Sequence, residues 1–277
     1  MTMRRNLLGM VALGAALALG PGAGPAQAQS ASLVKEIQSR GTLKVGMAES
    51  PPWQSPNPKT GEYEGFNVDL AKRAAEIMGV KLEIVPATWS TLIPGLEAKQ
   101  YDAVFANLFA TPQRALVVNF TEPYSNYGFH VMVNAAADVK AMDALNRPEV
   151  TFVGMSGTVE ESYPKELFPQ ATVKGIVTND VATWVGEVAS GRATAAFLDP
   201  GTYRILRAKN PNLDKRLRPL NGEDALVKPV GLAYAVRIEP ESTHMLNFLN
   251  TFIRDFVRNG ENVTLRDKWF DVLAQRD

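Results

Sequence analysis

The sequence predicts an α/β fold of two lobes, each with a mostly parallel sheet that carries helices on both faces. Short apolar strands alternate with amphipathic helices between residues 31 and 106, and the same alternation restarts at residue 151. Such alternation produces parallel sheets because each helix returns the chain to the same end of the sheet. Two further extended segments, 128–133 and 231–236, lie outside the alternation. We expect them to be two hinge strands, through which the chain leaves the first lobe and returns to it.

Spacing and capping residues mark the elements of the first lobe. Between residues 68 and 78 apolar side chains recur at helical spacing, Asn67 can cap the start of this helix, and Gly79 can end it. The other elements expected here are a helix at 31–40, strands at 43–47, 82–85 and 103–106, and a helix at 91–99.

The second lobe is expected over residues 133–226, and the first lobe over 29–132 together with a return segment, 227–277. Ligands favour clefts between domains, at the carboxyl ends of strands, so the cleft between the lobes is the expected site. The elements of the second lobe and of the return segment are strands at 151–155, 173–177 and 195–198, helices from Thr158 and at 181–189, and final helices at 245–257 and 265–273.

The N-terminus has the pattern of a secretory signal peptide over residues 1–28. Arg4 and Arg5 precede an uncharged apolar run at 7–19, and residues 26–28 read Ala-Gln-Ala, a typical cleavage site. The apolar run is shorter than the roughly 20 residues that a membrane-spanning helix needs. The chain has no cysteine that could carry a lipid. We therefore expect cleavage after Ala28 and a free protein outside the cytoplasmic membrane, in the periplasm.

Composition argues against several classes of function. Removing the two arginines of the signal segment leaves 29 − 2 = 27 basic residues against 29 acidic ones, a formal charge of −2 that does not suggest a nucleic-acid partner. The absence of cysteine rules out disulfides and thiol chemistry. Two histidines far apart in the sequence, His130 and His244, make a transition-metal site improbable. We expect neither a metal nor a cofactor.

Short motifs spread over the whole mature chain carry a family resemblance. They are Gly-Thr-Leu-Lys-Val-Gly at 41–46, Pro-Pro-Trp at 51–53, the segment 59–71, Thr-Pro-Gln-Arg at 111–114, Ser-Gly-Thr at 156–158, the strand end at 195–199 and Lys-Trp-Phe at 268–270. Because these motifs occur in this order, the chain resembles the periplasmic amino-acid-binding proteins of ABC importers (solute-binding protein family 3, polar amino acid group). The resemblance implies a type II periplasmic-binding-protein fold that closes on an amino acid or derivative. It also implies delivery to a membrane ABC permease, a monomer, and no catalytic activity.

The resemblance implies that Arg114 binds the ligand α-carboxylate and Asp199 the α-ammonium. A guanidinium offers a planar fork of donors that matches a carboxylate, and a carboxylate at the end of a strand can pair with an ammonium. Thr158 and the adjacent Val159 are placed at a strand-to-helix turn that can bind the same carboxylate. Structural roles are open as well: a surface position for Arg114, a helix cap for Asp199, and a capping box between Thr158 and Glu161.

Four residues of the first lobe complete the implied binding site. Trp53 occupies the position of an aromatic side chain over the ligand, with a core position as the alternative, and Glu49 precedes it in the same loop. Asn107 and Phe109 stand at the end of the third strand, where relatives carry small hydroxyl residues. Phe109 removes a hydroxyl and adds bulk, which favours an apolar, aromatic or modified amino acid. Tyr127 is expected only to pack near the crossover.

Two other readings of the sequence compete with a binding protein. Cyclohexadienyl dehydratases resemble the same family and use a glutamate in a Gly-Thr-x-Glu turn as an acid; Gly157-Thr158-Val159-Glu160 fits this pattern. A prephenate-like substrate would suit an aromatic cleft, although an ammonium-binding Asp199 has less use there. The second alternative is a detached sensor domain of a receptor kinase, which is disfavoured because no signalling domain follows.

Overall fold

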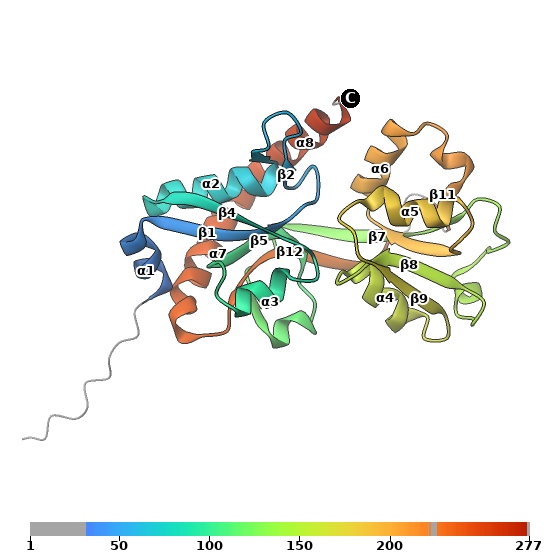
Figure 1. Cartoon of the computed structure of the whole chain (residues 1–277), viewed down its shortest axis with the longest axis horizontal. Helices are drawn as coiled ribbons and strands as arrows, with labels where there is room; N and C mark the ends of the chain where they lie inside the picture. The colour runs from blue at the N-terminus through green and yellow to red at the C-terminus, as the bar shows by residue number, and fades with distance from the viewer. Residues whose placement is uncertain (1–31, 221, 223–225, 276–277) are drawn as a thin grey trace, which may run out of the picture. The chain divides into compact units, whose positions relative to one another are not determined.

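The protein is described by a computed structural model that covers residues 32–220, 222 and 226–275 (Figure 1). The predicted signal peptide, 1–28, lies outside these residues. Within them ten strands form one sheet, with eight in the order β4-β1-β5-β12-β7-β10-β8-β9. Strand β6 (Val118–Phe120) pairs with β12, and β11 (Leu217–Pro219) pairs with β7. We call β4, β1, β5 and β6 the first half of the sheet, and β10, β8, β9 and β11 the second half.

The first half alternates strands and helices as the sequence predicts. Strand β1 pairs in parallel with both β4 and β5. The elements are α1 (Leu33–Arg40), β1 (Thr42–Ala48), α2 (Phe66–Met78), β4 (Lys81–Ala87), α3 (Leu92–Glu97), β5 (Ala103–Phe109) and the short helix η1 (Arg114–Leu116), with a small β2–β3 hairpin (Ser55–Pro56, Tyr63–Glu64) before α2. Helices α7 (Thr243–Arg258) and α8 (Glu261–Ala274) return to this half at the end of the chain.

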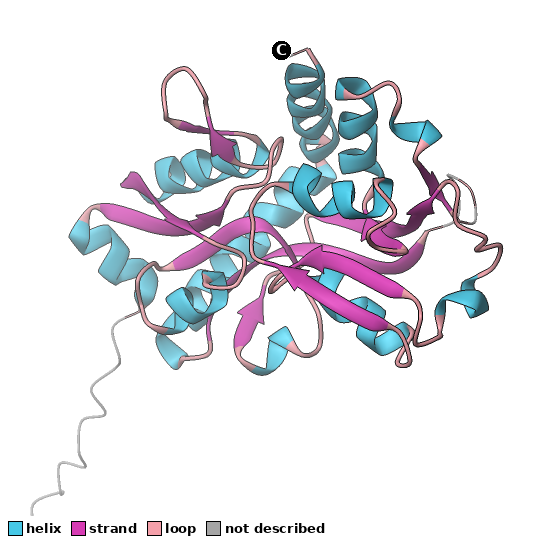
Figure 2. Cartoon of the chain, turned by 45° about the vertical axis from the view of Figure 1, so that its right-hand side comes forward, coloured by secondary structure: helices cyan, strands magenta, loops and turns pink. Residues whose placement is uncertain are grey.

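The second half repeats the alternation with its own helices (Figure 2). Strand β8 pairs in parallel with both β9 and β10. The elements are β8 (Thr151–Met155), α4 (Val159–Leu167), β9 (Thr172–Ile176), α5 (Val181–Ala189), β10 (Ala195–Leu198) and α6 (Pro200–Lys209), with the short helices η2 (Met142–Leu145) and η3 (Leu213–Lys215) in its connections.

Two neighbouring antiparallel strands, β7 (Ser125–Asn134) and β12 (Val227–Arg237), join the halves (Figure 1). They contain the segments 128–133 and 231–236 that the sequence predicts as hinge strands. The register of β12 shifts between Val227 and Val230, and Lys228 within this bulge has a φ of 49°. A lysine in the left-handed region is uncommon and indicates a local turn of the strand.

Alternate residues of the central strands belong to different apolar clusters, which explains why helices cover both faces. In β5, Ala103 and Phe105 pack in the cluster that includes α2, whereas Val104 and Ala106 pack in the cluster that includes α3. In β10 the same alternation separates the faces covered by α4 and α5. Side chains of successive strand residues point to opposite faces, so these apolar strands require cover on both. The predicted fold class is therefore confirmed.

One predicted cap is wrong. Helix α2 begins at Phe66 after Gly65, so Asn67 lies inside the helix rather than at its N-cap. Its side chain is fully buried: Nδ2 donates to Oε1 of Gln54 at 2.7 Å and Oδ1 accepts from the Tyr234 hydroxyl at 2.9 Å. Partners distant in sequence set the role of Asn67, and no local pattern could indicate them.

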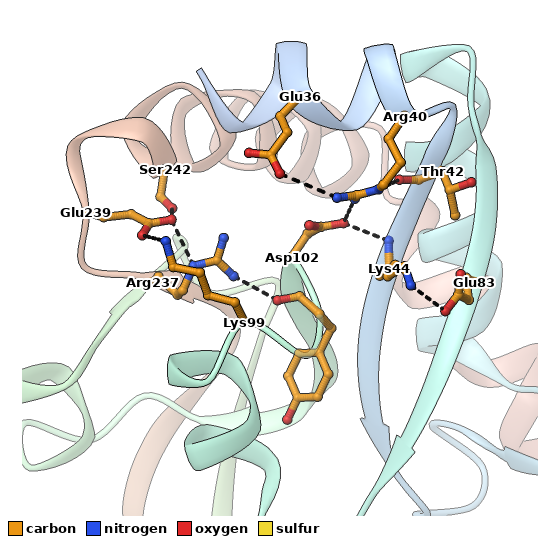
Figure 3. Close-up of polar contacts among 11 residues, drawn as sticks. Glu36, Arg40, Thr42, Lys44, Glu83, Lys99, Asp102, Arg237, Glu239 and Ser242 are labelled. Atoms are coloured by element: carbon orange, nitrogen blue, oxygen red, sulfur yellow. Dashed lines mark hydrogen bonds and ion pairs between the residues drawn. The ribbon is translucent and has the colours of Figure 1, made fainter. Parts of the chain in front are cut away.

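A polar network holds the ends of α1, β1 and β5 together (Figure 3). Asp102 is 5% exposed, accepts from the backbone N–H of Lys44 at 2.8 Å, and pairs with the Arg40 guanidinium. Nearby, Arg237 donates to the carbonyl of Tyr101 at 2.8 Å and to Glu239 at 2.8 Å. The buried carboxylate of Asp102 is thus paired and hydrogen-bonded, as a buried charge must be.

None of the helices in the described part of the chain is long and apolar enough to cross a membrane.

Candidate functional site

A cavity lies where side chains of both halves of the sheet meet, and its empty space, with the open solvent at its mouth included, is about 610 Å³. The strands of each half contribute their carboxyl ends, as expected for an α/β ligand site. From the first half and the crossing strands come Ser50, Trp53, Trp89, Asn107, Phe109, Arg114, Tyr127 and Leu232, and from the second half come Met155, Thr158, Glu160, Val181, Trp184, Leu198, Asp199 and Thr202.

Arg114 is the cation of this cavity. Thr111 accepts from the Arg114 backbone N–H through its hydroxyl at 3.3 Å, which fixes the turn that precedes η1. The guanidinium donates through Nη1 to the Phe109 carbonyl and through Nη2 to the Gly157 carbonyl, both at 3.0 Å. Burial lowers the pKa of Arg114, and Glu160 opposes this. A guanidinium has five N–H donors, so three remain for a ligand.

Asp199 lies at the end of β10 and caps helix α6. Its Oδ1 accepts from the backbone N–H of Thr202 at 2.9 Å, and Pro200 occupies the first helical position. Burial raises the pKa of Asp199, and the hydrogen bonds from Thr202 counteract that rise. The bond from the Thr202 N–H uses one of the two carboxylate oxygens. Asp199 therefore caps α6 and also lines the cavity.

The turn before α4 departs from a capping box. The Thr158 hydroxyl donates to the Met155 carbonyl at 2.7 Å and makes no cap bond within the helix. Glu161 reaches back one residue further than expected, because its Oε2 accepts from the N–H of Gly157 at 2.9 Å. Lys165 pairs with the other oxygen at 2.8 Å. Thr158 lines the cavity, whereas Glu161 stabilises the turn from outside it.

Glu160 is the second carboxyl group of the cavity. Its Oε2 is buried without a hydrogen-bond partner among the described residues. Burial raises the pKa of Glu160; the Thr158 side chain lowers it, Asp199 raises it further, and Arg114 lowers it. The ionised form of Glu160 is therefore less favourable here than in water, and a positively charged group beside it would favour ionisation again.

Aromatic rings form much of the cavity wall. Trp53 is 3% exposed and makes edge contacts with Tyr127 at 5.6 Å and with Phe270 at 5.7 Å between ring centroids. Phe109 makes an edge contact with Phe129 at 4.9 Å. The Trp53 ring is thus both a core residue and part of the cavity lining. Burial raises the pKa of Tyr127, with Asp199 adding to the rise.

Trp89 and Trp184 extend this wall, and the sequence interpretation did not identify either. Trp89, in the loop between β4 and α3, packs against apolar clusters of both halves. Trp184, on α5, is 2% exposed, and its Nε1 has no partner in the described part of the chain. A large aromatic residue between Thr88 and Ser90, at the carboxyl end of a strand, was a usable signal for Trp89. Trp184 lies among apolar residues at helical spacing, which indicated only a core position.

Asn107 is held by a buried amide chain. Its Oδ1 accepts from Nε2 of Gln54 at 3.0 Å, and its Nδ2 donates to the Ser50 hydroxyl at 3.2 Å. Gln54 also donates to the Ala48 carbonyl at 2.6 Å. The Asn107 side chain, which lines the cavity, is thus held in a fixed orientation.

The structure brings six of the predicted residues together in the cavity lining: Arg114, Asp199, Thr158, Trp53, Asn107 and Phe109. Two others are not part of that lining. Val159 is 1% exposed and packs in the core. Glu49 lies near Tyr63: burial is the main cause of the raised pKa of the Tyr63 phenol, and the charge of Glu49 raises it further. Among the described residues no group of His, Cys, Asp and Glu could hold a metal ion.

Comparisons with known proteins agree with this architecture. The chain is 27% identical over 231 residues to the arginine-binding extracellular protein ArtP of Bacillus subtilis, covering 83% of this chain and 87% of ArtP. It is 26% identical over 189 residues to the cyclohexadienyl dehydratase of Pseudomonas aeruginosa, covering 68% of this chain and 69% of the enzyme.

Among solved structures, the ancestral amino acid-binding protein AncCDT-1, a precursor of cyclohexadienyl dehydratase, has a TM-score of 0.71 and 32% identity. The similarity covers 87% of this chain and all of that protein, 100%. Residues 43–272 match the model of one family along nearly the whole described chain. The chain belongs to the bacterial extracellular solute-binding proteins, family 3.

Proposed function

We propose that the solute bound by this protein is an amino acid or amino-acid derivative, held between two lobes that close on it. The observation that carries the proposal is that Arg114 and Asp199 line one cavity from opposite halves of the sheet. Together they offer a donor fork for an α-carboxylate and a carboxylate for an α-ammonium. Aromatic rings from Trp53 and Trp89 supply apolar surface for the rest of the ligand.

The proposed mechanism is hinged closure. Residues 29–132 and 227–277 form one lobe and 133–226 the other, and the hinge lies in β7 and β12. A ligand that contacts both lobes favours the closed state by its differential affinity for that state. The closed protein, as a monomer in the periplasm after loss of residues 1–28, delivers the ligand to an ABC permease and performs no chemistry. ArtP, an arginine-binding relative, supports this assignment.

The test is isothermal titration calorimetry of the purified protein, refolded to remove carried-over ligand, against the natural α-amino acids. One chemical class should bind, and Arg114→Ala and Asp199→Asn should each lower its affinity at least about a hundredfold, because charged hydrogen bonds contribute about 1.5–3 kcal/mol and an unpaired buried partner adds to the loss. Arg254→Ala is the matched control, since Arg254 is half-exposed and its ion pair with Glu122 lies on the surface. Absence of binding by every α-amino acid would reject the proposal.

One observation favours a second candidate, a cyclohexadienyl dehydratase. Glu160 is a cavity carboxyl group whose pKa is raised by burial, which suits a general acid. Such an enzyme converts prephenate to phenylpyruvate with loss of water and carbon dioxide. Formation of phenylpyruvate, abolished in Glu160→Gln and retained in Glu161→Gln, would establish the enzyme; no turnover together with amino-acid binding would reject it.

A further inference from the structure

Two residues of the cavity lining each have a buried polar atom with no partner in the described part of the chain: Oε2 of Glu160 and Nε1 of Trp184. Buried polar groups are nearly always hydrogen-bonded, and leaving one unsatisfied is unfavourable. Glu160 can accept a hydrogen bond at Oε2, whereas Trp184 can only donate one. A ligand that satisfies Oε2 of the ionised Glu160 must carry an N–H or O–H group at that point.

The charges of the lining do not balance. Among its described residues, Arg114 is the cation and Glu160 and Asp199 are the anions. An α-amino acid brings one carboxylate for Arg114 and one ammonium for Asp199, so it leaves Glu160 unmatched. Burying an unmatched carboxylate is strongly unfavourable, but a second positive charge on the ligand would pair with it.

The aromatic wall offers a suitable surface for that charge. Three of the four tryptophans of the chain, Trp53, Trp89 and Trp184, line the cavity. The face of an indole ring attracts a cation more strongly than the other aromatic rings do. The wall can therefore pack against the aliphatic part of a side chain and also stabilise a cationic end.

We propose that the ligand carries a second cationic N–H group, an ammonium or a guanidinium, and that Glu160 is the residue that selects it. This inference rests on the proposed function, because Arg114 and Asp199 must hold the α-groups for Glu160 to remain free. It narrows the ligand from an amino acid in general to a basic amino acid or a basic derivative.

Proton linkage gives an independent signature. The groups that face Glu160 are Arg114 from η1, Asp199 at the start of α6, and Thr158 and Tyr163 from α4. Burial raises the pKa of Glu160, and a cationic ligand at Oε2 would lower it again. Binding of a basic ligand should therefore release protons, and its affinity should fall as the pH falls. A neutral ligand should show neither effect.

The experiment compares arginine with citrulline, which has nearly the same shape but a neutral end group, by titration calorimetry in two buffers of different ionisation enthalpy. Lysine and norleucine form a second pair. The unchanged protein should prefer the basic member of a pair at least about thirtyfold, with proton release, as measured coupling energies of close charge pairs suggest. In Glu160→Gln the preference should shrink to about threefold or less and proton release should disappear. Glu161→Gln is the matched control and should behave like the unchanged protein, because Glu161 lies outside the cavity.

The outcomes separate this inference from the proposed function. Tight binding of a neutral amino acid with no preference for a basic one, or a basic preference that survives in Glu160→Gln, would overturn the role of Glu160 and leave amino-acid binding intact. Absence of binding by any amino acid would overturn both. Thermal unfolding of Glu160→Gln checks that the variant is folded, and the neutral ligand serves as its binding control.

Discussion

The Nη2 of Arg114 donates a 3.0 Å hydrogen bond to the carbonyl oxygen of Gly157, across the boundary between the two halves of the sheet. Gly157 lies in the turn before α4 with a φ of +81°, and a Cβ built on it would lie 2.8 Å from the Cα of Ser90. Backbone from the two halves therefore approaches closely on one side of the cavity. We infer that this contact belongs to the closed state, because separating the halves would break it.

Replacement of Gly157 by alanine should weaken closure. The added Cβ would clash with the Ser90 backbone, and the left-handed conformation disfavours alanine by about 1–2 kcal/mol. We expect ligand affinity to fall at least about tenfold. Small-angle X-ray scattering should also show a smaller ligand-induced decrease in the radius of gyration than in the unchanged protein.

Gly186→Ala is the matched control for this variant. Gly186 lies inside α5, and a Cβ there would meet no atom within 4 Å. Alanine should raise stability by up to about 1 kcal/mol and leave binding unchanged, because glycine is a poor helix former. If Gly157→Ala bound ligand and contracted like the unchanged protein, the Arg114–Gly157 contact would have no part in closure.

Glu160→Gln should stabilise the ligand-free protein. The change removes the charge that burial makes unfavourable, and we expect a gain of about 1–3 kcal/mol in the free energy of unfolding at neutral pH. The sign with pH follows from the raised pKa of Glu160. This carboxyl group contributes most to the free energy of unfolding when the pH is below its pKa in the unfolded state. The contribution is lost as the pH rises through its pKa in the folded state. The advantage of the variant should thus shrink on acidification.

Glu161→Gln should show the opposite sign. Burial alone would raise the pKa of Glu161, but hydrogen bonds from Lys165 and the Gly157 N–H outweigh it and lower the pKa. The variant should be slightly less stable than the unchanged protein at neutral pH, and the difference should vanish as the pH falls through the folded pKa of Glu161. Chemical denaturation between pH 4 and pH 8 tests both glutamates; equal pH profiles for the two variants would contradict the assignment.

Asp102→Asn should destabilise the first half of the sheet. The variant loses the ion pair with Arg40 and weakens the bond to the Lys44 N–H (Figure 3). Burial raises the pKa of Asp102 and so offsets part of what these bonds contribute. We expect a loss of about 1 kcal/mol in the free energy of unfolding, because the Arg40 guanidinium and the Lys44 N–H lose a charged acceptor. Asp138→Asn is the control: its pair with Lys140 is almost fully exposed and should contribute less than about 0.5 kcal/mol. Similar losses in both variants would contradict the role of the network.

Ligand binding should change the tryptophan fluorescence of the protein. Trp53, Trp89 and Trp184 line the cavity, whereas Trp269 bonds through Nε1 to Asp69 at 2.9 Å outside it. Trp89→Phe should therefore reduce the amplitude of the signal, and Trp269→Phe should leave it unchanged. A signal that disappears in Trp269→Phe would place the ligand elsewhere.

Much of the architecture was predictable because it depends on short-range patterns. Alternating strands and helices indicated two α/β units, and the boundaries of α5 and β10 agree with the apolar spacing. Arg114 and Asp199 were predicted as site residues because the family resemblance implies ligand contacts at these positions, and both line the cavity.

The rest of the site depends on contacts that no local pattern encodes. Trp184 looks like any other apolar residue of its helix, and its cavity position follows from where α5 packs. The sequence suggested different candidate roles for Glu160 and Glu161, but only the structure shows that Glu160 lines the cavity while Glu161 pairs with Lys165. Asn67 was misread as a cap because its partners, Gln54 and Tyr234, come from other elements.

The path of the chain through β7 and β12 also decides the order in which the halves can be completed during synthesis. Strand β12 lies between β5 and β7 in the sheet, and α1 packs against α7 from the far end of the chain. The second half is built from one continuous stretch of chain. The first half also needs β12 and α7, which are synthesised near the end of the chain. Long-range pairing of this kind slows folding. The half with which the chain begins is thus the last to become complete, and any truncation before β12 would remove a central strand of the sheet.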